Sequence, residues 1–564
     1  MAIADLRARG VLELLDVELA RALGAMTDVA NPDVELAIAL TSRNVRRGHA
    51  CLPLGTAESD LGPTAGEVAP TLPEHESWAR VLSESALVDG GPLVLDEKHR
   101  LYLRRYWELE RDIAKELAKR SESKAPEPGP WIAEALDRLF ESDAESPQKQ
   151  AARNALEHHV SVLCGGPGTG KTSTVAAIVA LLVEGRLRHD GHAPKVMLLA
   201  PTGKAAVRLG EAVARAKKTI TAADEVLASI PTEATTVHRA LGMRRHGMRF
   251  TRSADFPIDA DIVVLDEASM IDLGIMRQLL VAAPVDATIV IVGDPDQLTS
   301  VEAGSVLRDL VRASDGTWWR DRVTRLTKTY RYDESQPLGQ LVASIRGGDS
   351  ALVETLLKAD VAGDVQWSPL DDLGNELGRA SVQWSEIVNA TDAEEHFQRR
   401  GQYVVLSPFR KGPIGTRQVG VAIEQRIAGV DPAVHPIIIE ENNSELGVYN
   451  GDFGILFEHD SIRMATIQRE PNRFQDFAEA RLPRYSSAYA LSVHKAQGSE
   501  FDEVLILMPE EDVPLLTREL LYTAVSRARA RVRLVGPREV IAAAVGRRAQ
   551  RFSGLVDQIA ALAP

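Results

Sequence analysis

The sequence predicts an α/β protein with two parallel-sheet domains, a helical N-terminal domain and a small β insertion. From residue 131 onward, short apolar runs such as VMLLA, DIVVLD and ATIVIVGD alternate with helical stretches. This alternation is typical of parallel sheets with helices on their faces. A second set of runs begins with YVVLSP at 403 and closes with RVRLVG at 531–536, so two α/β domains are expected. At 564 residues the chain is also too long for one hydrophobic core.

The first 120 residues predict the helical domain. Leu12, Leu15, Leu19 and Leu23 recur at helical spacing, so we expect them to form one apolar face. The domain should end before SESKAPEPGP, because its three prolines and one glycine cannot continue a helix.

The remaining limits follow from composition and turn chemistry. Residues 121–130 are the predicted linker, and the two α/β domains are expected at 131–340 and 341–564. The second should carry the β insertion at about 432–484, where short strands meet Asn-Gly turn chemistry. A basic stretch within about 243–256, RRHGMRFTR, predicts a short hairpin in the first.

A phosphate-binding loop is predicted where an apolar strand meets a helix. The motif GGPGTGKT fits the pattern G-x-x-x-x-G-K-[ST] in the strand–helix context that the pattern requires. Its residues, with the serine that follows, are Gly165, Gly166, Pro167, Gly168, Thr169, Gly170, Lys171, Thr172 and Ser173. The glycines let backbone N–H groups face phosphates at a helix N-terminus. Lys171 would bind the β and γ phosphates, and the Thr172 hydroxyl would bind Mg²⁺, so ATP and Mg²⁺ are the predicted cofactors.

Two further strand ends supply candidate catalytic groups. DIVVLDEASM places Asp266 to hold Mg²⁺ and Glu267 to position or deprotonate the attacking water. GDPDQL places Gln297 where ligands of open parallel sheets gather, as a sensor of the γ-phosphate or as a plain turn residue. Arg331 and Arg527 are candidates to reach the phosphates from outside, although helical arginines are mostly surface or salt-bridge residues.

Composition limits the DNA-binding modes, the metal and disulfide sites and the cellular location that are expected for this chain. The formal net charge of −15 argues mildly against wholesale adsorption to DNA, so a DNA groove would have to be locally basic. Cys51 and Cys164 are too few for a disulfide framework, a four-cysteine zinc site or an iron–sulfur cluster. Because no apolar run approaches the roughly 20 residues that cross a bilayer, we expect a cytoplasmic location without a membrane partner.

Eight segments occur in a fixed order along the chain. They are GGPGTGKT (165), APTGKAAVRL (200), TVHRALG (236), DEASM (266), GDPDQL (293), LTKTYR (326), YALSVHKAQGSEFD (489) and YTAVSRAR (522). Together they resemble the motif set of superfamily 1 DNA helicases. VEAGSVLRDL (301), LSPFRKGPIGTRQV (406) and SVHKAQGSEFDEV (492) are similar to the RecD family, the alpha subunits of RecBCD enzymes (exonuclease V). The N-terminal segments LLDVELARAL and RRGHACLPL (46–54) also resemble that family.

The resemblance implies two RecA-like P-loop motor domains, an SH3-like insertion and 5′ to 3′ movement on single-stranded DNA. It implies that Gln148 reads the adenine, that Gly498 and Glu500 belong to the nucleotide motifs, and that Arg331 and Arg527 are arginine fingers. The implied DNA contacts are Thr202, Lys204, His238, Ser492, His494 and Gln497.

The implied partners are duplex DNA ends and RecB-like and RecC-like subunits in a heterotrimer that acts in recombinational repair. The basic hairpin would lie at the duplex junction or would simply be solvated. Outside the ATP motifs we find no carboxylate-rich cluster of the kind a nuclease needs, so the chain itself is not expected to be the nuclease.

Three other interpretations stay open at this point. The chain could be a stand-alone RecD-like 5′ to 3′ helicase, a docking subunit whose motor only opens or locks an assembly, or a P-loop NTPase with a target other than nucleic acid. The intact Lys171 and Glu267 argue against the docking subunit, and the net charge alone supports the last.

Overall fold

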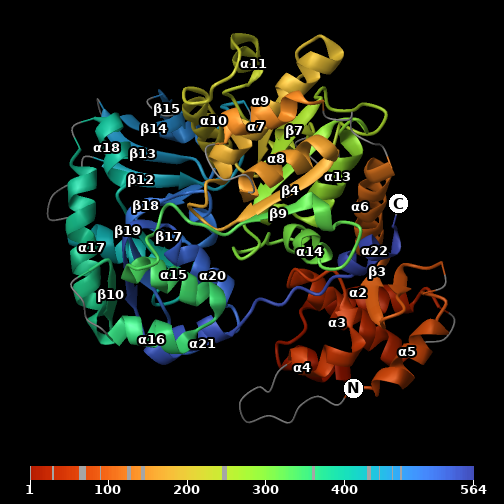
Figure 1. The fold of residues 1–564 in the computed structure, drawn as a ribbon. Helices are drawn as coiled ribbons and strands as arrows, with labels where there is room; N and C mark the ends of the chain where they lie inside the picture. The colour runs from red at the N-terminus through yellow and green to blue at the C-terminus, as the bar shows by residue number, and fades with distance from the viewer. Residues whose placement is uncertain are drawn as a thin grey trace.

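The computed structural model describes most of the chain as two parallel sheets flanked by helices, with an antiparallel sheet and an N-terminal domain attached (Figure 1). The described residues are 2–27, 31–61, 72–88, 90–122, 129–140, 146–243, 250–358, 363–390, 392–427, 434–443, 445–459, 462–470 and 473–563. Residues 244–249, in the middle of the predicted basic hairpin, lie outside them.

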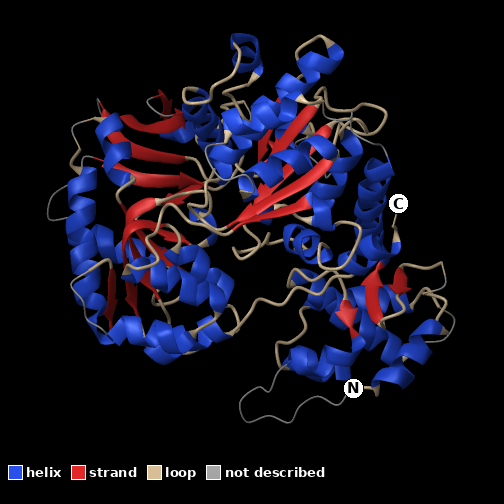
Figure 2. Ribbon diagram, in the orientation of Figure 1, coloured by secondary structure: helices blue, strands red, loops and turns tan. Residues whose placement is uncertain are grey.

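The first parallel sheet has six strands in the order β6-β5-β7-β8-β4-β9. They are β4 (Val160–Gly165), β5 (Val196–Ala200), β6 (Thr235–Thr236), β7 (Ile262–Leu265), β8 (Thr288–Gly293) and β9 (Val323–Leu326). Consecutive residues of one strand point to opposite faces of the sheet and pack in different hydrophobic cores, as Val162 and Leu163 of β4 do. Helices therefore cover both faces (Figure 2), which explains why these strands are continuously apolar.

The helices of this domain connect its strands. They are α7 (Trp131–Leu139), α8 (Pro147–Glu157), α9 (Lys171–Asp190), α10 (Gly203–Lys217), α11 (Asp224–Ser229), α12 (Val237–Ala240), α13 (Leu273–Ala282) and α14 (Val306–Ala313). Residues 174–184 of α9 are buried, so packing fixes the middle of the helix that follows the phosphate-binding loop.

The second parallel sheet has five strands in the order β10-β19-β18-β11-β17. They are β10 (Val365–Ser368), β11 (Tyr403–Ser407), β17 (Ala490–Ser492), β18 (Phe501–Leu507) and β19 (Ala528–Val535). Its helices are α15 (Pro337–Gly347), α16 (Ser350–Lys358), α17 (Leu373–Val388), α18 (Ala393–Arg400), α19 (Thr416–Ile427), α20 (Arg518–Val525) and α21 (Arg538–Gly546). The predicted second α/β domain is thus present.

An antiparallel sheet in the order β15-β14-β13-β12-β16 lies between α19 and β17 in the sequence. Its strands are β12 (Val434–Ile439), β13 (Phe453–His459), β14 (Ile462–Glu470), β15 (Arg473–Ala478) and β16 (Tyr485–Ser487). The turn before β13 contains Gly451, whose φ of 95° favours glycine. The SH3-like form of this insertion stays a prediction.

The N-terminal domain combines helices with a small antiparallel sheet, β1-β3-β2. Its elements are α1 (Ala2–Ala8), α2 (Leu14–Gly24), α3 (Pro32–Arg46), β1 (Leu52–Pro53), α4 (Ala57–Leu61), α5 (His75–Ser83), β2 (Leu93–Leu95) and β3 (Arg100–Leu103). The expected apolar face of α2 is wrong at Leu15, whose side chain is 61% exposed. Asp16 is buried instead, because Arg46 and Ser42 donate hydrogen bonds to its carboxylate.

Two helices far apart in the sequence join this domain to the first sheet. Helix α6 (Arg104–Glu122) packs against α13, and the C-terminal α22 (Leu555–Ala561) packs against α6 and α14. Arg120 fixes the end of α6, since its guanidinium donates to four backbone carbonyls, including Leu280 O and Ala283 O at 2.7 Å. The chain thus returns from α21 to the N-terminal side (Figure 1). The domain limits stay a prediction.

Among the described helices, none combines the length and the apolar character that a membrane span requires.

Candidate nucleotide site

The phosphate-binding loop joins β4 to α9. Gly168 and Gly170 have φ angles of 76° and 81°, which side-chain-bearing residues rarely adopt. Lys171 Nζ donates to the carbonyl oxygens of Gly165 at 2.8 Å and Gly166 at 2.9 Å. Thr172 is half-buried in the first turn of α9, and Ser173 is exposed. The loop therefore curves around its own lysine at the N-terminus of a buried helix.

The acidic pair follows β7. The Glu267 N–H donates to Asp266 Oδ1 at 2.8 Å, and Glu267 itself adopts a left-handed φ of 51°. Burial and the charge of Glu267 raise the pKa of Asp266 to about 6, while Lys171 opposes the shift. A cation beside Asp266 would favour its ionised form.

Gln297 is buried at the end of the loop after β8. Its Nε2 donates to Asp294 Oδ2 at 3.0 Å, and the Tyr522 hydroxyl donates to the same oxygen at 3.0 Å. Within the described part of the chain, Gln297 Oε1 is buried without a hydrogen-bond partner. Because Tyr522 comes from α20, this network joins the two α/β domains. Leu298 N extends it by donating to Thr523 Oγ1 at 2.9 Å.

Arg331 lies against the phosphate-binding loop. The preceding residue donates its backbone N–H to Gly168 O at 2.7 Å, and a Cβ added at Gly168 would lie 2.1 Å from Arg331 Cβ. Arg331 Nη2 pairs with Glu500 Oε1 at 2.5 Å. Burial would raise the pKa of Glu500, but Arg331, Arg208 and Arg527 lower it to about 2. Glu500 thus holds Arg331 at the loop.

Arg527 is placed differently. It is 3% exposed and donates to Thr523 O at 3.1 Å and to Ser499 O at 3.2 Å. Both acceptors belong to the second α/β domain, so the structure holds Arg527 within that domain, whereas Arg331 contacts the loop directly.

Two side chains at the loop were not singled out from the sequence, although Tyr522 begins the segment YTAVSRAR. A Cβ added at Gly166 would lie 2.9 Å from the Tyr522 hydroxyl and 3.5 Å from Arg346 Nη1. Arg346 is in α15, where no local motif distinguishes it from a surface arginine. It brings a second cation to the loop from the far side of the interface.

The other predicted nucleotide residues are spread out. Gln148 is in the first turn of α8, which packs beside β4 and β9. The Pro167 carbonyl accepts from Thr329 Oγ1 at 3.4 Å. Gly498 has a φ of 66°, and its carbonyl accepts from Arg208 Nη1 at 2.6 Å, so it forms part of the domain interface.

The predicted DNA contacts fall into two groups. Thr202 and Lys204 begin α10, where Thr202 Oγ1 accepts from the Ala205 N–H and caps the helix. His238 is in α12, and burial lowers its pKa. These residues belong to the first α/β domain.

The second group follows β17 in the second domain. Ser492 Oγ accepts from Lys495 N at 3.4 Å, and Gln497 Nε2 donates to Leu298 O at 3.0 Å across the domain interface. Burial, followed by the charges of Arg551 and Arg410, lowers the pKa of His494.

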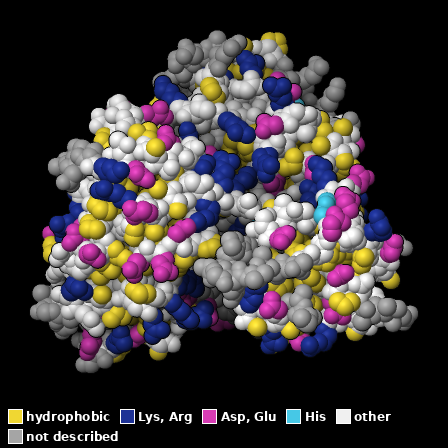
Figure 3. Space-filling model, turned by 90° about the horizontal axis from the view of Figure 1, so that it is seen from below, with side chains coloured by type: hydrophobic (Ala, Val, Ile, Leu, Met, Phe, Trp, Pro, Cys, Tyr) yellow, Lys and Arg dark blue, Asp and Glu magenta, His cyan; other side chains and the backbone are white. Residues whose placement is uncertain are grey.

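Seen from below, Lys and Arg side chains gather near the middle of the face of the molecule (Figure 3), so the acidic chain is locally basic there.

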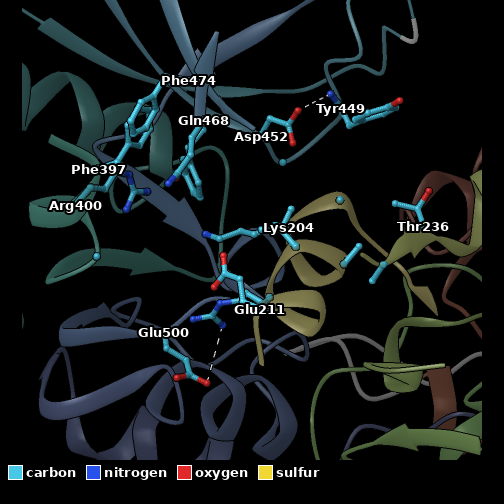
Figure 4. Close-up of a pocket in the computed structure, with 18 of the residues that line it drawn as sticks. Lys204, Glu211, Thr236, Phe397, Arg400, Tyr449, Asp452, Gln468, Phe474 and Glu500 are labelled. Carbon is cyan, nitrogen blue, oxygen red and sulfur yellow. Dashed lines mark hydrogen bonds and ion pairs between the residues drawn. The ribbon is translucent and has the colours of Figure 1, made fainter. Parts of the chain in front are cut away.

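Lys204 also lines a cavity of about 660 Å³ between α10, α18 and the antiparallel sheet (Figure 4). Its Nζ lies 4.1 Å from the centroid of the Phe453 ring. Burial lowers the pKa of Lys204 well below its usual value.

A phosphate-binding loop on one parallel sheet, closed by side chains of a second, defines a two-domain P-loop nucleotide-binding protein. Three families match the chain: the AAA domain at residues 148–303, the UvrD-like helicase C-terminal domain at 487–535, and the N-terminal domain of RecBCD enzyme subunit RecD at 8–102.

The relatives agree with these matches. The chain is 36% identical to RecBCD enzyme subunit RecD of Mycolicibacterium smegmatis, covering 97% of each chain. It is 28% identical to the ATP-dependent RecD2 DNA helicase of Deinococcus radiodurans, covering 95% of this chain and 70% of that protein. A structure of Pif1 helicases at forked double-stranded DNA matches with a TM-score of 0.40 and 14% identity, covering 71% of this chain and 94% of that one. The chain belongs to the family of RecBCD enzyme subunit RecD.

Proposed function

We propose that the chain is the ATP-driven 5′ to 3′ DNA helicase subunit of a RecBCD-type helicase–nuclease that acts on DNA ends in recombinational repair. The observation that carries the proposal is the contact of Arg331 with Gly168, with Glu500 of the second domain holding the same arginine. Hydrolysis of ATP at the loop would thereby depend on the relative position of the two domains. A motor needs this coupling to convert hydrolysis into movement.

The catalytic roles follow from chemistry. Lys171 would bind the phosphates, and Thr172 and Asp266 would supply oxygen ligands for Mg²⁺. Glu267 would orient the attacking water. Gln297 would sense the γ-phosphate by donating from Nε2, while its unpartnered Oε1 would accept a hydrogen bond from that water.

The remaining nucleotide roles concern the domain interface. Arg331 and Arg527 would act as arginine fingers, and Arg527 would have to leave its carbonyl partners in the closed state. Gln148 would read the adenine, and Gly498 and Glu500 would couple the nucleotide to the DNA-binding motif. Arg346 adds a further cation beside Gly166.

The strand would run past Thr202, Lys204 and His238 of the first domain and Ser492, His494 and Gln497 of the second. Hydroxyl, ammonium and imidazole groups suit phosphate contacts, which carry no sequence code. These contacts would position single-stranded DNA.

A subunit is favoured over a stand-alone helicase by sequence identity. The chain is 36% identical to the M. smegmatis subunit and 28% identical to the D. radiodurans helicase. Residues 8–102 would dock RecB-like and RecC-like partners, and Leu14 and Leu15 of α2 are exposed at 55% and 61% in that region. Nuclease activity would come from the assembly in the cytoplasm, not from this chain. The stand-alone RecD2-like helicase is the alternative.

The test measures ATP hydrolysis with and without single-stranded DNA, with Lys171→Ala and the exposed-surface control Lys358→Ala. We expect stimulation by DNA in the natural protein and in Lys358→Ala, and none in Lys171→Ala. Unwinding of duplexes with 5′ or 3′ tails then tests the direction, since preference for a 3′ tail would contradict it. Monomeric, fully processive unwinding without partners would favour the alternative.

A further inference from the structure

Two histidines of the N-terminal domain lie side by side. His75 begins α5, and His99 ends the turn that joins β2 to β3 (Figure 1). His75 Nε2 lies 3.2 Å from His99 Nδ1, and the two rings meet edge to face with centroids 5.0 Å apart. Both side chains are half-exposed. Two neutral imidazoles at this distance can share a hydrogen bond, but the same separation also suits two ligands of one metal ion.

Glu76 supplies a third candidate ligand. One nitrogen of each histidine and one Glu76 oxygen lie within 4.8 Å of one another. Glu76 Oε1 is 3.7 Å from His75 Nδ1, and its side chain is 68% exposed, so it is free to turn toward the histidine pair. The helix does not need it as a cap, because the Glu74 carboxylate accepts from the N–H groups of Glu76 and Ser77. The two glutamates also offset the positive end of the helix dipole, which would otherwise disfavour a cation.

The backbone of His99 is strained. Among the described residues other than glycine, only His99 and Glu267 have a left-handed φ, of 54° and 51°. Glu267 belongs to the nucleotide site, and strain of this kind gathers at functional sites. Hydrogen bonds hold His99 in place, since Leu54 N donates to its carbonyl at 3.1 Å and its own N–H donates to Asp96 O at 2.9 Å. The turn therefore holds the backbone that carries this imidazole in one position.

The cations that flank His99 in the sequence are paired elsewhere. Lys98 Nζ lies 2.7 Å from Asp557 Oδ1, and Arg100 Nε lies 2.6 Å from Asp96 Oδ2. Each of these positive charges is thus balanced by a carboxylate of its own. The charge of Glu76 stays available to balance an ion bound at the histidine pair.

We infer that His75, Glu76 and His99 form a binding site for one Zn²⁺ ion. Zinc–nitrogen distances of about 2.0–2.1 Å in tetrahedral geometry separate two nitrogen ligands by about 3.3–3.4 Å, close to the separation of the two imidazoles. Imidazoles favour zinc, whereas Mg²⁺ and Ca²⁺ prefer oxygen ligands alone. Three protein ligands leave a fourth position for water. The ion would tie α5 to the turn between β2 and β3, a role that goes beyond the proposed function and does not depend on it.

The test titrates the metal-free full chain with Zn²⁺ against a chromophoric chelator. His99→Asn removes the imidazole, while asparagine tolerates the left-handed φ. The matched control is His435→Ala, since His435 lies 3.2 Å from Glu424 but belongs to no group of three ligands in the described structure. The natural protein and His435→Ala should bind one more equivalent of Zn²⁺ than His99→Asn. Loss of a group outside the ligand shell already costs about 10–100-fold in metal affinity, so loss of the imidazole should cost at least about 100-fold.

Two further measurements separate metal binding from a structural role. Zn²⁺ should raise the melting temperature of the natural protein and of His435→Ala by more than that of His99→Asn, because an ion bound only by the folded state stabilises it. Glu76→Gln changes an exposed side chain, so it should fold normally and bind Zn²⁺ more weakly than the natural protein. An excess of Mg²⁺ should not displace the ion.

The outcomes are distinct. Equal Zn²⁺ stoichiometry and affinity in the natural protein and His99→Asn, or in Glu76→Gln where His99→Asn does not fold, overturn the inference. An equal loss in His435→Ala means that zinc binds to surface histidines at large, which also overturns it. A lower melting temperature of metal-free His99→Asn with unchanged Zn²⁺ binding shows a plain hydrogen bond between the rings, again against the inference. The ATPase comparison with Lys171→Ala tests the proposed function separately.

Discussion

Gly168→Ala should displace Arg331 from the phosphate-binding loop. The new Cβ would lie 2.1 Å from Arg331 Cβ, whereas carbon atoms pack at about 3.5–4.0 Å, so the two segments must part by about 1.5–2 Å. The left-handed φ of 76° adds about 1–2 kcal/mol of backbone strain for alanine. A misplacement of about 1 Å can cost about 100-fold in rate, so we expect a loss of that order in DNA-stimulated kcat.

Gly170→Ala is the matched control for strain. Gly170 has a nearly equal φ of 81°, but its added Cβ would meet only the Tyr330 ring at 3.8 Å, which is ordinary contact. Both variants should lower the melting temperature through backbone strain, and Gly168→Ala should lower it further because of the clash with Arg331. ATP affinity is measured separately for each, so that weaker nucleotide binding is not mistaken for a slower chemical step.

A double variant shows whether Arg331 carries the effect. If Gly168→Ala acts by displacing Arg331, then Gly168→Ala/Arg331→Ala should lose little more kcat than Arg331→Ala alone. Losses that simply add, or a Gly168→Ala enzyme whose kcat equals that of Gly170→Ala at saturating ATP, would refute the reasoning.

Three further outcomes are expected. Leu15→Glu should weaken co-purification with RecB-like and RecC-like subunits and leave ATPase activity intact. The control Val421→Glu, at a similarly exposed site in the second domain, should assemble normally. Equal effects of the two variants on co-purification would contradict a docking role for α2. Arg346→Ala should raise the KM for ATP about tenfold, the loss of one charged hydrogen bond, with Lys358→Ala unchanged. Burial alone would raise the pKa of Asp16, but hydrogen bonds from an arginine, a backbone amide and a serine lower it below 3.8. Its stabilising contribution is therefore complete above pH 3.8 and lost as pH falls through the lowered pKa, so the melting-temperature gap to Asp16→Asn should narrow on acidification; a gap independent of pH would refute this.

The sequence was most informative where function is local. The loop from Gly165 to Thr172 could be predicted because phosphate binding needs glycines, a lysine and a helix start within eight consecutive residues. The alternation of strands and helices was equally readable, since both faces of each parallel sheet must be apolar.

Where tertiary contacts determine the burial or role of a residue, the sequence contained no signal or a misleading one. Periodicity favoured Leu15 as a core residue, but the ion pair of Asp16 with Arg46 turns α2 so that the aspartate is buried and Leu15 faces outward. Arg346 looks like an ordinary helical arginine. Only the placement of α15 beside the loop distinguishes it.

The segment after Gln297 connects the first α/β domain to the second α/β domain, the C-terminal segment and the N-terminal domain. Leu298 is hydrogen-bonded to the second domain through both its N–H and its carbonyl. Two residues further on, Ser300 O accepts from Arg551 of the C-terminal segment at 3.1 Å, and Gly304 N donates to Gly48 O of the N-terminal domain at 3.0 Å. Hydrogen bonds tolerate displacements of only a few tenths of an ångström. A partner that shifts the N-terminal domain must therefore break these bonds or move the segment that holds the buried amide beside the nucleotide site. Since linkage is reciprocal, a nucleotide that moves this segment changes partner affinity by the same factor.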